Sequence, residues 1–255
     1  MLLFVRAKAG VRLTPEGACL LPEARRLLRH LDALKRDARQ LGAGDSGTVL
    51  LGCVSAAAYN TIPALLPAFH RRYPGIKLRL QEATSDLQLA ALGRGEIDAG
   101  LLLPPIDDAA IGYLPVFRDK LVAALPTSPT GREAFAQGAR ISLRRLAASA
   151  FILFPRKAAP GLYDSIIGAC REAGFSPRIE QEAIEMQTIV SLVAAGMGVT
   201  LVPASLARLR RAGVVYKPFV ERSPTMEIGL AWRADHVSPA LRVLIEFVTE
   251  MVRKT

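Results

Sequence analysis

The sequence has few of the residues that build disulfide frameworks and metal centres. Its 255 residues include three cysteines, which are far apart and lack CxxC spacing, and three scattered histidines. Separated cysteines in odd number indicate neither a disulfide framework nor a zinc site, and no histidine has a second ligand at metal-binding spacing. The sequence therefore predicts no metal and no cofactor, and it favours a reducing, cytoplasmic environment.

Long apolar runs are missing from the front of the chain. The first run, Leu2 to Val5, is far shorter than the roughly 7–15 apolar residues of a secretory signal or the ~20 of a membrane span. We therefore expect neither a leader peptide nor a membrane partner.

The short motifs of common enzymes are absent as well. There is no G-x-S-x-G, no P-loop and no G-x-G-x-x-G at a strand-to-helix turn. The acidic residues Glu180, Glu182 and Glu185 precede a predicted helix, where a solvated cluster favoured by the helix dipole is a simpler explanation than acid/base catalysis. The chain is not expected to be an enzyme.

Positive charge is what the sequence has in excess. Its formal net charge is +10, and residues 1–41 hold nine Arg and Lys against four Asp and Glu. Such a charge suits a polyanion partner, although an arginine-rich composition alone also produces it. With 51% hydrophobic residues, the chain is apolar and long enough to fold around a sizeable core.

One long helix is predicted from Ala18 to Leu41, where the only proline is Pro22 and there is no glycine. Its apolar residues are spaced alternately by four and three positions, as in a heptad seam, which predicts self-association. These residues are Leu20, Ala24, Leu27, Leu31, Leu34, Ala38 and Leu41. The alternative is packing on the chain's own core, for which Leu21 and Leu28 widen the apolar face.

After a flexible linker at 42–47, the pattern changes to alternating strands and helices. A β-α-β-α-β order predicts a parallel sheet with right-handed crossovers. Ser85 and Gln88 have the spacing of a capping box at the start of the second helix. The expected elements are, in order, 48–54, 62–73, 76–82, 85–92 and 97–103.

A second α/β unit lies between two short strands that each end at a proline, 121–126 and 199–203. A chain that leaves one lobe at 126 and returns at 203 has a cleft between its lobes, and such clefts bind small ligands. Strand, helix, strand and helix of the second unit are expected at 150–154, 162–173, 178–183 and 187–195. Strands at 214–217 and 226–232 and a final helix capped by Ser238 complete the first lobe.

Polar groups follow the strands that end at this cleft. Ser55 follows the first strand and Thr84-Ser85 the second, and hydroxyls with free backbone N–H groups at helix starts form anion sites. Each one alone is more simply explained as a helix cap. The carboxyl ends of neighbouring parallel strands nevertheless meet in one crevice. On the other lobe, the turn Phe154–Tyr163 runs through Pro160-Gly161 into a helix and is expected to face the same crevice.

Several motifs, in the same order and along essentially the whole chain, resemble LysR-type transcriptional regulators. They are Val11–Gly17 with Leu20–Leu28, Ile62–Phe69 with Arg72-Tyr73-Pro74, Leu89–Asp98, and Leu192–Pro203. The resemblance implies an α/β, two-lobed effector domain of the type II periplasmic-binding-protein-like fold, preceded by a long linker helix and the remnant of a winged helix-turn-helix. It also implies a homodimer or homotetramer that binds a small-molecule inducer and promoter or operator DNA, and it leaves RNA polymerase open as a further partner.

Within that family, Phe154-Pro155, Pro160–Tyr163 and Glu185-Met186-Gln187 most resemble regulators of aromatic-compound catabolism. Many of that branch have an arginine before the Pro-Pro pair, where this chain has Leu103, which disfavours a dicarboxylic inducer and leaves a monoacid or a less polar aromatic compound open. The resemblance places an aromatic-acid inducer against Ser55, Ala56, Thr84, Ser85, Leu103, Phe154, Pro160, Gly161 and Leu162.

The same resemblance implies a division of the chain. Residues 1–17 correspond to the wing of the winged helix-turn-helix, with Arg6, Lys8 and Arg12 against DNA phosphates. The helix that reads the major groove is not among these residues, so we expect weak DNA binding without sequence preference. The expected units are a linker and dimerisation helix at 18–44, effector subdomain I at 45–125 and 204–255, and subdomain II at 126–203.

The mechanism expected from this organisation is a population shift. An inducer closes the cleft about the strands at 121–126 and 199–203 and thereby reorients the linker helices of the oligomer. The alternative is a solute-binding protein of the same two-lobed fold, because fold alone does not determine function. Such a protein needs a signal peptide and has no use for a coiled-coil seam.

Overall fold

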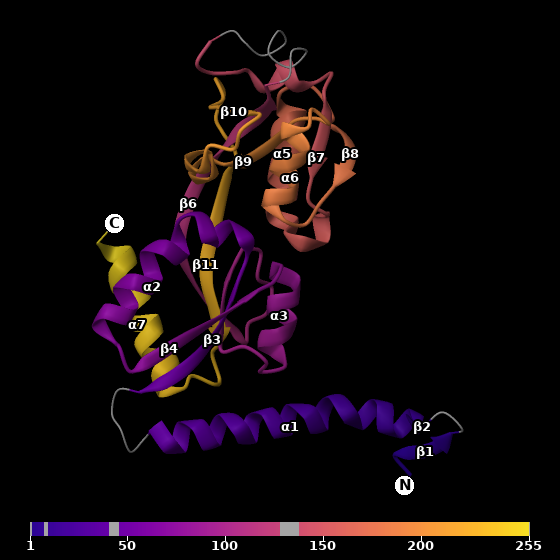
Figure 1. Ribbon diagram of the computed structural model, residues 1–255, viewed down its shortest axis with the longest axis vertical. Helices are drawn as coiled ribbons and strands as arrows, with labels where there is room; N and C mark the ends of the chain where they lie inside the picture. The colour runs from indigo at the N-terminus through magenta and orange to yellow at the C-terminus, as the bar shows by residue number, and fades with distance from the viewer. Residues whose placement is uncertain (1, 8–9, 41–45, 128–137, 255) are drawn as a thin grey trace.

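The computed structural model describes residues 2–7, 10–40, 46–127 and 138–254. Figure 1 shows a long helix lying beside one end of a two-lobed body, with a small hairpin at the helix's far end. Within the described parts of the chain, no helix is long and apolar enough to cross a membrane.

The hairpin and the long helix form the front of the molecule. Strands β1 (Phe4–Ala7) and β2 (Gly10–Leu13) pair antiparallel, and α1 runs over Pro15–Gln40, starting three residues before the predicted Ala18. The earlier start has a local cause, since the hydroxyl of Thr14 accepts a hydrogen bond from the Gly17 N–H at 3.0 Å and so caps the helix. Proline is well tolerated at the first helical position.

The first lobe has the predicted β-α-β-α-β order. Strand β3 (Gly47–Cys53) pairs in parallel with β4 (Ile76–Glu82) and β5 (Ala99–Leu102), and α2 (Thr61–Arg72) and α3 (Ser85–Gly93) are the crossovers. Strand β11 (Thr225–Arg233) adds antiparallel beside β5, and α7 (Pro239–Arg253) follows it. In Figure 1, α2 and α7 cover one face of this sheet and α3 the other.

Helix capping follows the prediction at one site and departs from it at another. The hydroxyl of Ser238 caps α7 by accepting from the Leu241 N–H at 3.2 Å, as expected. The capping box predicted for Ser85 and Gln88 is wrong: Ser85 Oγ accepts from the Leu103 N–H at 3.0 Å, and Gln88 Nε2 donates to the Ala83 carbonyl at 2.8 Å. Both side chains are buried, and buried polar groups take the nearest available partners, which here are backbone groups just past the ends of β5 and β4.

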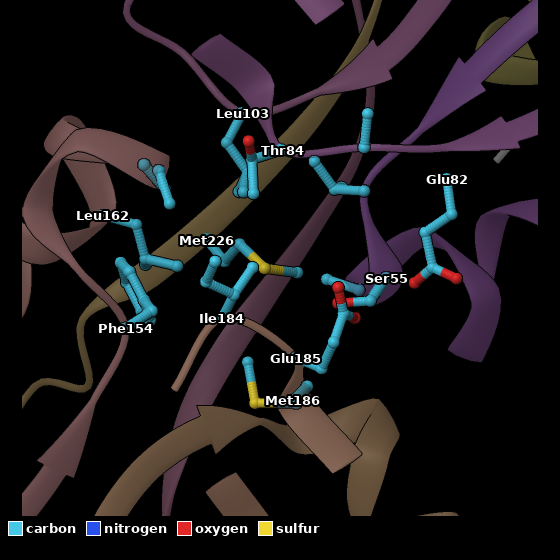
Figure 2. A pocket seen from close by; sticks show the side chains of 15 residues that line it. Ser55, Glu82, Thr84, Leu103, Phe154, Leu162, Ile184, Glu185, Met186 and Met226 are labelled. Carbon is cyan, nitrogen blue, oxygen red and sulfur yellow. The ribbon is translucent and has the colours of Figure 1, made fainter. Parts of the chain in front are cut away.

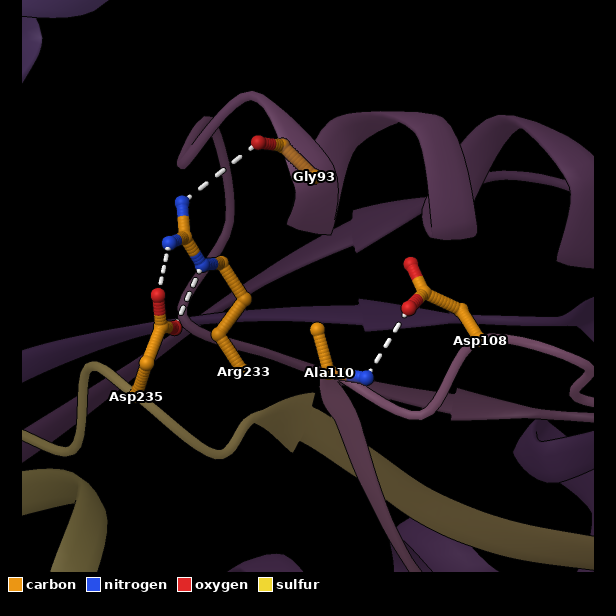
Figure 3. A network of polar contacts seen from close by, with 5 residues as sticks. All are labelled: Gly93, Asp108, Ala110, Arg233 and Asp235. Atoms are coloured by element: carbon orange, nitrogen blue, oxygen red, sulfur yellow. Dashed lines mark hydrogen bonds and ion pairs between the residues drawn. The ribbon is translucent and has the colours of Figure 1, made fainter.

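The turn after β11 is held by a polar network that Figure 3 shows. Arg233 Nε donates to Asp235 at 2.9 Å, and its guanidinium also donates to the carbonyl of Gly93, the last residue of α3, at 3.5 Å. Beside it, Asp108 accepts from the Ala110 N–H at 2.9 Å. These contacts fix the ends of α3 and β11 against each other.

The second lobe is built on the far half of one long strand, β6 (Ile111–Pro126). Its first half pairs with β11, and its last residues pair antiparallel with β9 (Thr200–Pro203) and β10 (Val214–Lys217). The two proline-ended stretches of the sequence therefore lie side by side. Because β10 also pairs with β6, the chain returns to the first lobe after Lys217, later than the predicted return at Pro203.

The remaining elements of the second lobe match the predicted α/β unit. Strand β7 (Ala150–Leu153) pairs in parallel with β8 (Arg178–Glu182). A single β-bridge between Phe151 and Val199 also joins β7 to the residue directly before β9. Helices α5 (Pro160–Glu172) and α6 (Met186–Ala194) complete the unit. Each lies within two residues of its predicted limits, because apolar periodicity identifies a helix better than its ends.

Candidate functional site

A cavity of about 500 Å³, including the space at its open mouth, lies between the two lobes. The first lobe contributes Ser55, Thr84 and Leu103, which follow the ends of β3, β4 and β5. The second lobe contributes residues after β7 and at the starts of α5 and α6, and Met226 enters from β11. In Figure 2 the leucines and Phe154 gather on one side, and the carboxylates of Glu82 and Glu185 lie with Ser55 on the other.

The structure brings most of the predicted effector-binding residues to this cavity. Six line it: Ser55, Ala56, Thr84, Leu103, Phe154 and Leu162. The other three do not line it. Ser85 is buried behind it, where it accepts the hydrogen bond from Leu103, while Pro160 and Gly161 form the start of α5 beside it.

Gly161 lies where the two lobes meet. A Cβ added there would be 2.7 Å from the carbonyl oxygen of Pro104 and 3.0 Å from Cδ of Pro105. The start of α5 in the second lobe therefore packs directly on the backbone that follows β5 in the first. Only glycine allows this approach, so Gly161 has a steric role that the sequence alone did not indicate.

We predict that Gly161→Ala is destabilising by about 1–3 kcal/mol, because backbone atoms have to move to accept the methyl group. Gly168→Ala in the same helix is the matched control, since a Cβ there meets nothing within 4 Å and alanine favours the helix. Thermal unfolding of both variants checks this, with small-angle scattering to detect separated lobes. Equal melting temperatures for the two variants would contradict the lobe contact.

Three helices begin at the cavity, and this is its main electrostatic feature. Thr84, Ala159 and Glu185 are the N-cap residues of α3, α5 and α6, and all three line the cavity. In the described structure, none of these N-cap side chains accepts a hydrogen bond from its own helix. The first N–H groups of a helix lack intrahelical partners and carry partial positive charge, so three such ends together attract an anion.

Two carboxylates oppose this field from opposite lobes. Glu82 ends β4 and Glu185 precedes α6, and none of the described residues that line the cavity is an arginine or a lysine. Burial raises the pKa of Glu82 above its usual value, and the neighbouring charge of Glu185 raises it further. Burial, followed by the same two carboxylates, raises the pKa of Tyr59 to about 12.

The mouth of the cavity continues this acidic character. A larger open groove outside it, of about 1220 Å³, shares Glu82 and Glu185 and adds Asp86 and Glu96, against Arg94 and Lys157. Arg94 donates to Glu96 at 2.7 Å, so its charge is already paired. The entrance to the cleft is therefore acidic, although the chain as a whole has a net charge of +10.

Sequence reasoning missed several residues of the cavity. From the sequence, Glu185 is expected in a solvated cluster and Met186 appears only within a family motif, while Glu82, Ile184 and Met226 are not predicted. The position of Glu82 at the end of a parallel strand was an available signal. Nothing in the sequence around Met226 shows that β11 passes behind the cleft.

The long helix presents two different faces. Arg29 lies 3.6 Å from Glu96 of the effector domain, and the ring of His30 stacks edge-on against that of His236 at 4.6 Å between centroids. Leu20, Leu27 and Leu31 are 43%, 66% and 47% exposed. Of the rest of the predicted seam, Ala24 is partly buried, Leu34 and Ala38 have side chains outside the described residues, and Leu41 lies outside them entirely.

The hairpin carries the predicted phosphate contacts on both faces. Cross-strand partners share a face, and Arg6 pairs with Val11 while Arg12 pairs with Val5, so the two exposed arginines lie on opposite faces. Lys8 lies outside the described residues. In the part of the chain that the structure describes, no group of three His, Cys, Asp or Glu is placed to hold a metal ion.

Comparison with known proteins gives a consistent result. The family model described as LysR substrate binding domain matches residues 42–253. The HTH-type transcriptional regulator IlvR of Caulobacter vibrioides is 41% identical over 251 residues, which are 97% of this chain and 82% of that protein. The HTH-type transcriptional regulator TfdS of Cupriavidus pinatubonensis is 33% identical over 96% of this chain and 82% of its own.

Solved structures of proteins from the same family are also similar to this chain. CbnR, a LysR family transcriptional regulator, matches with a TM-score of 0.80 at 27% identity, covering 97% of this chain and 84% of that one. The BenM effector binding domain with its effector benzoate matches with a TM-score of 0.67 at 25% identity, covering 81% of this chain and 92% of that one.

Two lobes joined by long strands, with a cavity onto which helix N-termini open, define a ligand-binding domain of the periplasmic-binding-protein-like fold. The match to a family model then identifies which family within that class the chain belongs to. The chain belongs to the LysR family of transcriptional regulators, as its motifs predicted, and residues 42–253 are its effector-binding domain.

Proposed function

We propose that this regulator senses a small organic acid with one carboxylate and an apolar, aromatic body. The observation that carries the proposal is the meeting of three helix N-termini without side-chain caps at one cavity. Their N–H groups suit a carboxylate, and the wall of Leu103, Phe154 and Leu162 suits a ring. The BenM domain, which has benzoate as its effector, shares this fold.

The charge balance supports one carboxylate rather than two. Among the described residues of the cavity wall there is no arginine or lysine for a second acid group, and Leu103 stands before Pro104-Pro105. Glu82 from the first lobe and Glu185 from the second add negative charge at one side of the cavity. The donors at the helix starts are therefore sufficient for a single carboxylate, and a second would lie against like charge.

We predict that benzoate binds about five-fold more tightly to Glu82→Gln and to Glu185→Gln than to the unchanged chain, as the loss of about 1 kcal/mol of repulsion implies. Because the pKa of Glu82 is raised above that of an ordinary carboxylate, binding to the unchanged chain should also strengthen as the pH falls from neutral toward that raised pKa and Glu82 begins to gain a proton. Isothermal titration calorimetry over this pH range measures both effects.

Benzylamine and benzyl alcohol are the comparison ligands, because they keep the ring and change the charge of the head group. Glu246→Gln on α7, away from the cavity, is the matched control and should leave affinity unchanged. Benzylamine binding more tightly than benzoate at neutral pH would overturn the choice of an acid.

We also propose that the leucine seam of α1 joins two copies of the chain. The described leucines of the seam are exposed, while Arg29 and His30 contact the chain's own effector domain. The apolar seam of the helix is therefore free to pack against a second helix, as in a coiled coil. We therefore expect the chain to form a homodimer, or a homotetramer made of two such dimers.

Replacing Leu27 and Leu31 together by glutamate should therefore reduce the assembly to monomers. Leu87→Glu on α3, where the leucine is 59% exposed and off the seam, should leave the assembly unchanged. Size-exclusion chromatography with light scattering measures both. An unchanged chain that is monomeric at all concentrations would contradict the proposed role of the seam.

We propose in addition that the hairpin contacts DNA phosphates through Arg6, Lys8 and Arg12. Arginines on both faces suit a wing placed in a groove, where phosphates flank it on both sides.

DNA binding by these 255 residues should be weak and independent of the DNA sequence. The combined change of Arg6 and Arg12 to alanine should reduce the slope of log affinity against log salt concentration by about two, because two phosphate contacts are lost. Arg79→Ala on β4, also exposed, is the control. Tight, operator-specific binding by this chain would contradict the proposal, and fluorescence anisotropy at several salt concentrations decides it.

A further inference from the structure

A second hollow, of about 610 Å³ including the space at its opening, lies next to the effector cavity. Pro104, Pro105 and Gly161 form part of its wall, where the two lobes meet. Nothing in the function proposed above uses this space.

The two spaces share three residues. Leu103, Leu162 and Met226 line both, so the partition between them is made of these side chains. Met226 is 1% exposed and lies between Leu103 and Leu162 on one side and the carboxylates on the other in Figure 2. Methionine is unbranched and adapts its shape easily, so of the three residues it yields most readily to a ligand.

The effector cavity is polar at one side and apolar at the other, and this partition lies toward its apolar side. Glu82, Glu185 and Ser55 lie together at one side, and the apolar side chains lie at the other (Figure 2). A ligand whose head group is held on the polar side, at Ser55 and the first N–H groups of α6, therefore directs its apolar part toward Met226. A longer apolar part meets Met226 and then the second hollow.

The second hollow suits an apolar group in spite of the glutamate in its wall. The carboxylate of Glu227 accepts from Tyr113 Oη at 2.9 Å and from Arg118 Nε at 2.6 Å, so its charge is paired outside the hollow. Apart from Glu227 and Thr225, its described wall consists of leucine, methionine, proline and glycine residues.

We propose that this hollow is a second, apolar subsite of the effector cavity, reached past Met226, and that it takes the chain or ring of an effector longer than benzoate. The inference rests on the proposed effector cavity and names the shape of the compound that fills it: a polar head, an apolar linker of a few carbons and an apolar end.

Two probe series test the subsite without knowledge of the natural effector. Benzoate, 3-phenylpropanoate and 5-phenylpentanoate vary the length with an acidic head, and the phenylalkylamines of equal length do so with a basic one. Each CH₂ that becomes buried should tighten binding by up to about four-fold, the equivalent of about 0.8 kcal/mol. Calorimetry on the full chain should show this increase in at least one series.

Two variants act on the subsite from different sides. Thr225→Trp fills the hollow from a position that does not line the effector cavity, and it should remove the dependence on length. Met226→Ala opens the partition, and it should strengthen the longest probe relative to the shortest. Val220→Trp, at a position that is 59% exposed and outside both spaces, is the matched control and should keep the dependence of the unchanged chain.

The outcomes separate this inference from the proposed function. If short probes bind and affinity does not depend on length, or if Thr225→Trp leaves that dependence intact, the subsite is refuted while the effector cavity stands. If no probe of either series binds the folded chain, both are refuted. Melting temperatures of the variants show that each is folded.

Discussion

The pairing of β6 with strands of both lobes is the constraint on which the rest of the structure depends. Its first half is hydrogen-bonded to β11 and its last residues to β9 and β10, so one continuous strand belongs to two sheets. The lobes cannot separate without breaking this ladder, and any change in the angle between them would have to bend it. The cavity lies beside this junction, and Met226 reaches it from β11, the other strand that passes the junction.

The cavity owes its chemistry to the same arrangement. Strand order places the ends of β3, β4 and β5 at the cavity, where β4 leads into α3, and in the second lobe β7 and β8 are followed by α5 and α6. Three helix N-termini supply a positive field at the cavity, and none of the described residues that line it is an arginine or a lysine. The selectivity that we propose, for a ligand with one carboxylate, therefore depends on the balance between these backbone dipoles and the two glutamates.

Much of this architecture was predictable, and particular residues show why. Strand β4 matches its predicted limits, Ile76 to Glu82, because alternation is strong there, and Ser238 caps α7 as its Ser-Pro signal indicates. The capping box at Ser85 and Gln88 failed because local spacing does not show that both residues are buried against β5. The return of the chain was placed too early because Val214–Lys217 has no feature that reveals its partner in the sheet.

The candidate site was predictable on one lobe and less so where the lobes meet. Ser55 and Thr84 follow from the rule that parallel strands end together, whereas Leu103 is expected there only from the family resemblance. The steric role of Gly161 and the place of Met226 depend on how closely two separately folded units approach, which no local pattern encodes.

The central claim is that a carboxylate binds at the three helix starts, and backbone hydrogen exchange with saturating benzoate tests it most directly. The account predicts slower exchange of the first-turn amides of α3, α5 and α6, with both lobes protected together. Saturated binding that leaves these amides unchanged, or protects only one lobe, would contradict it.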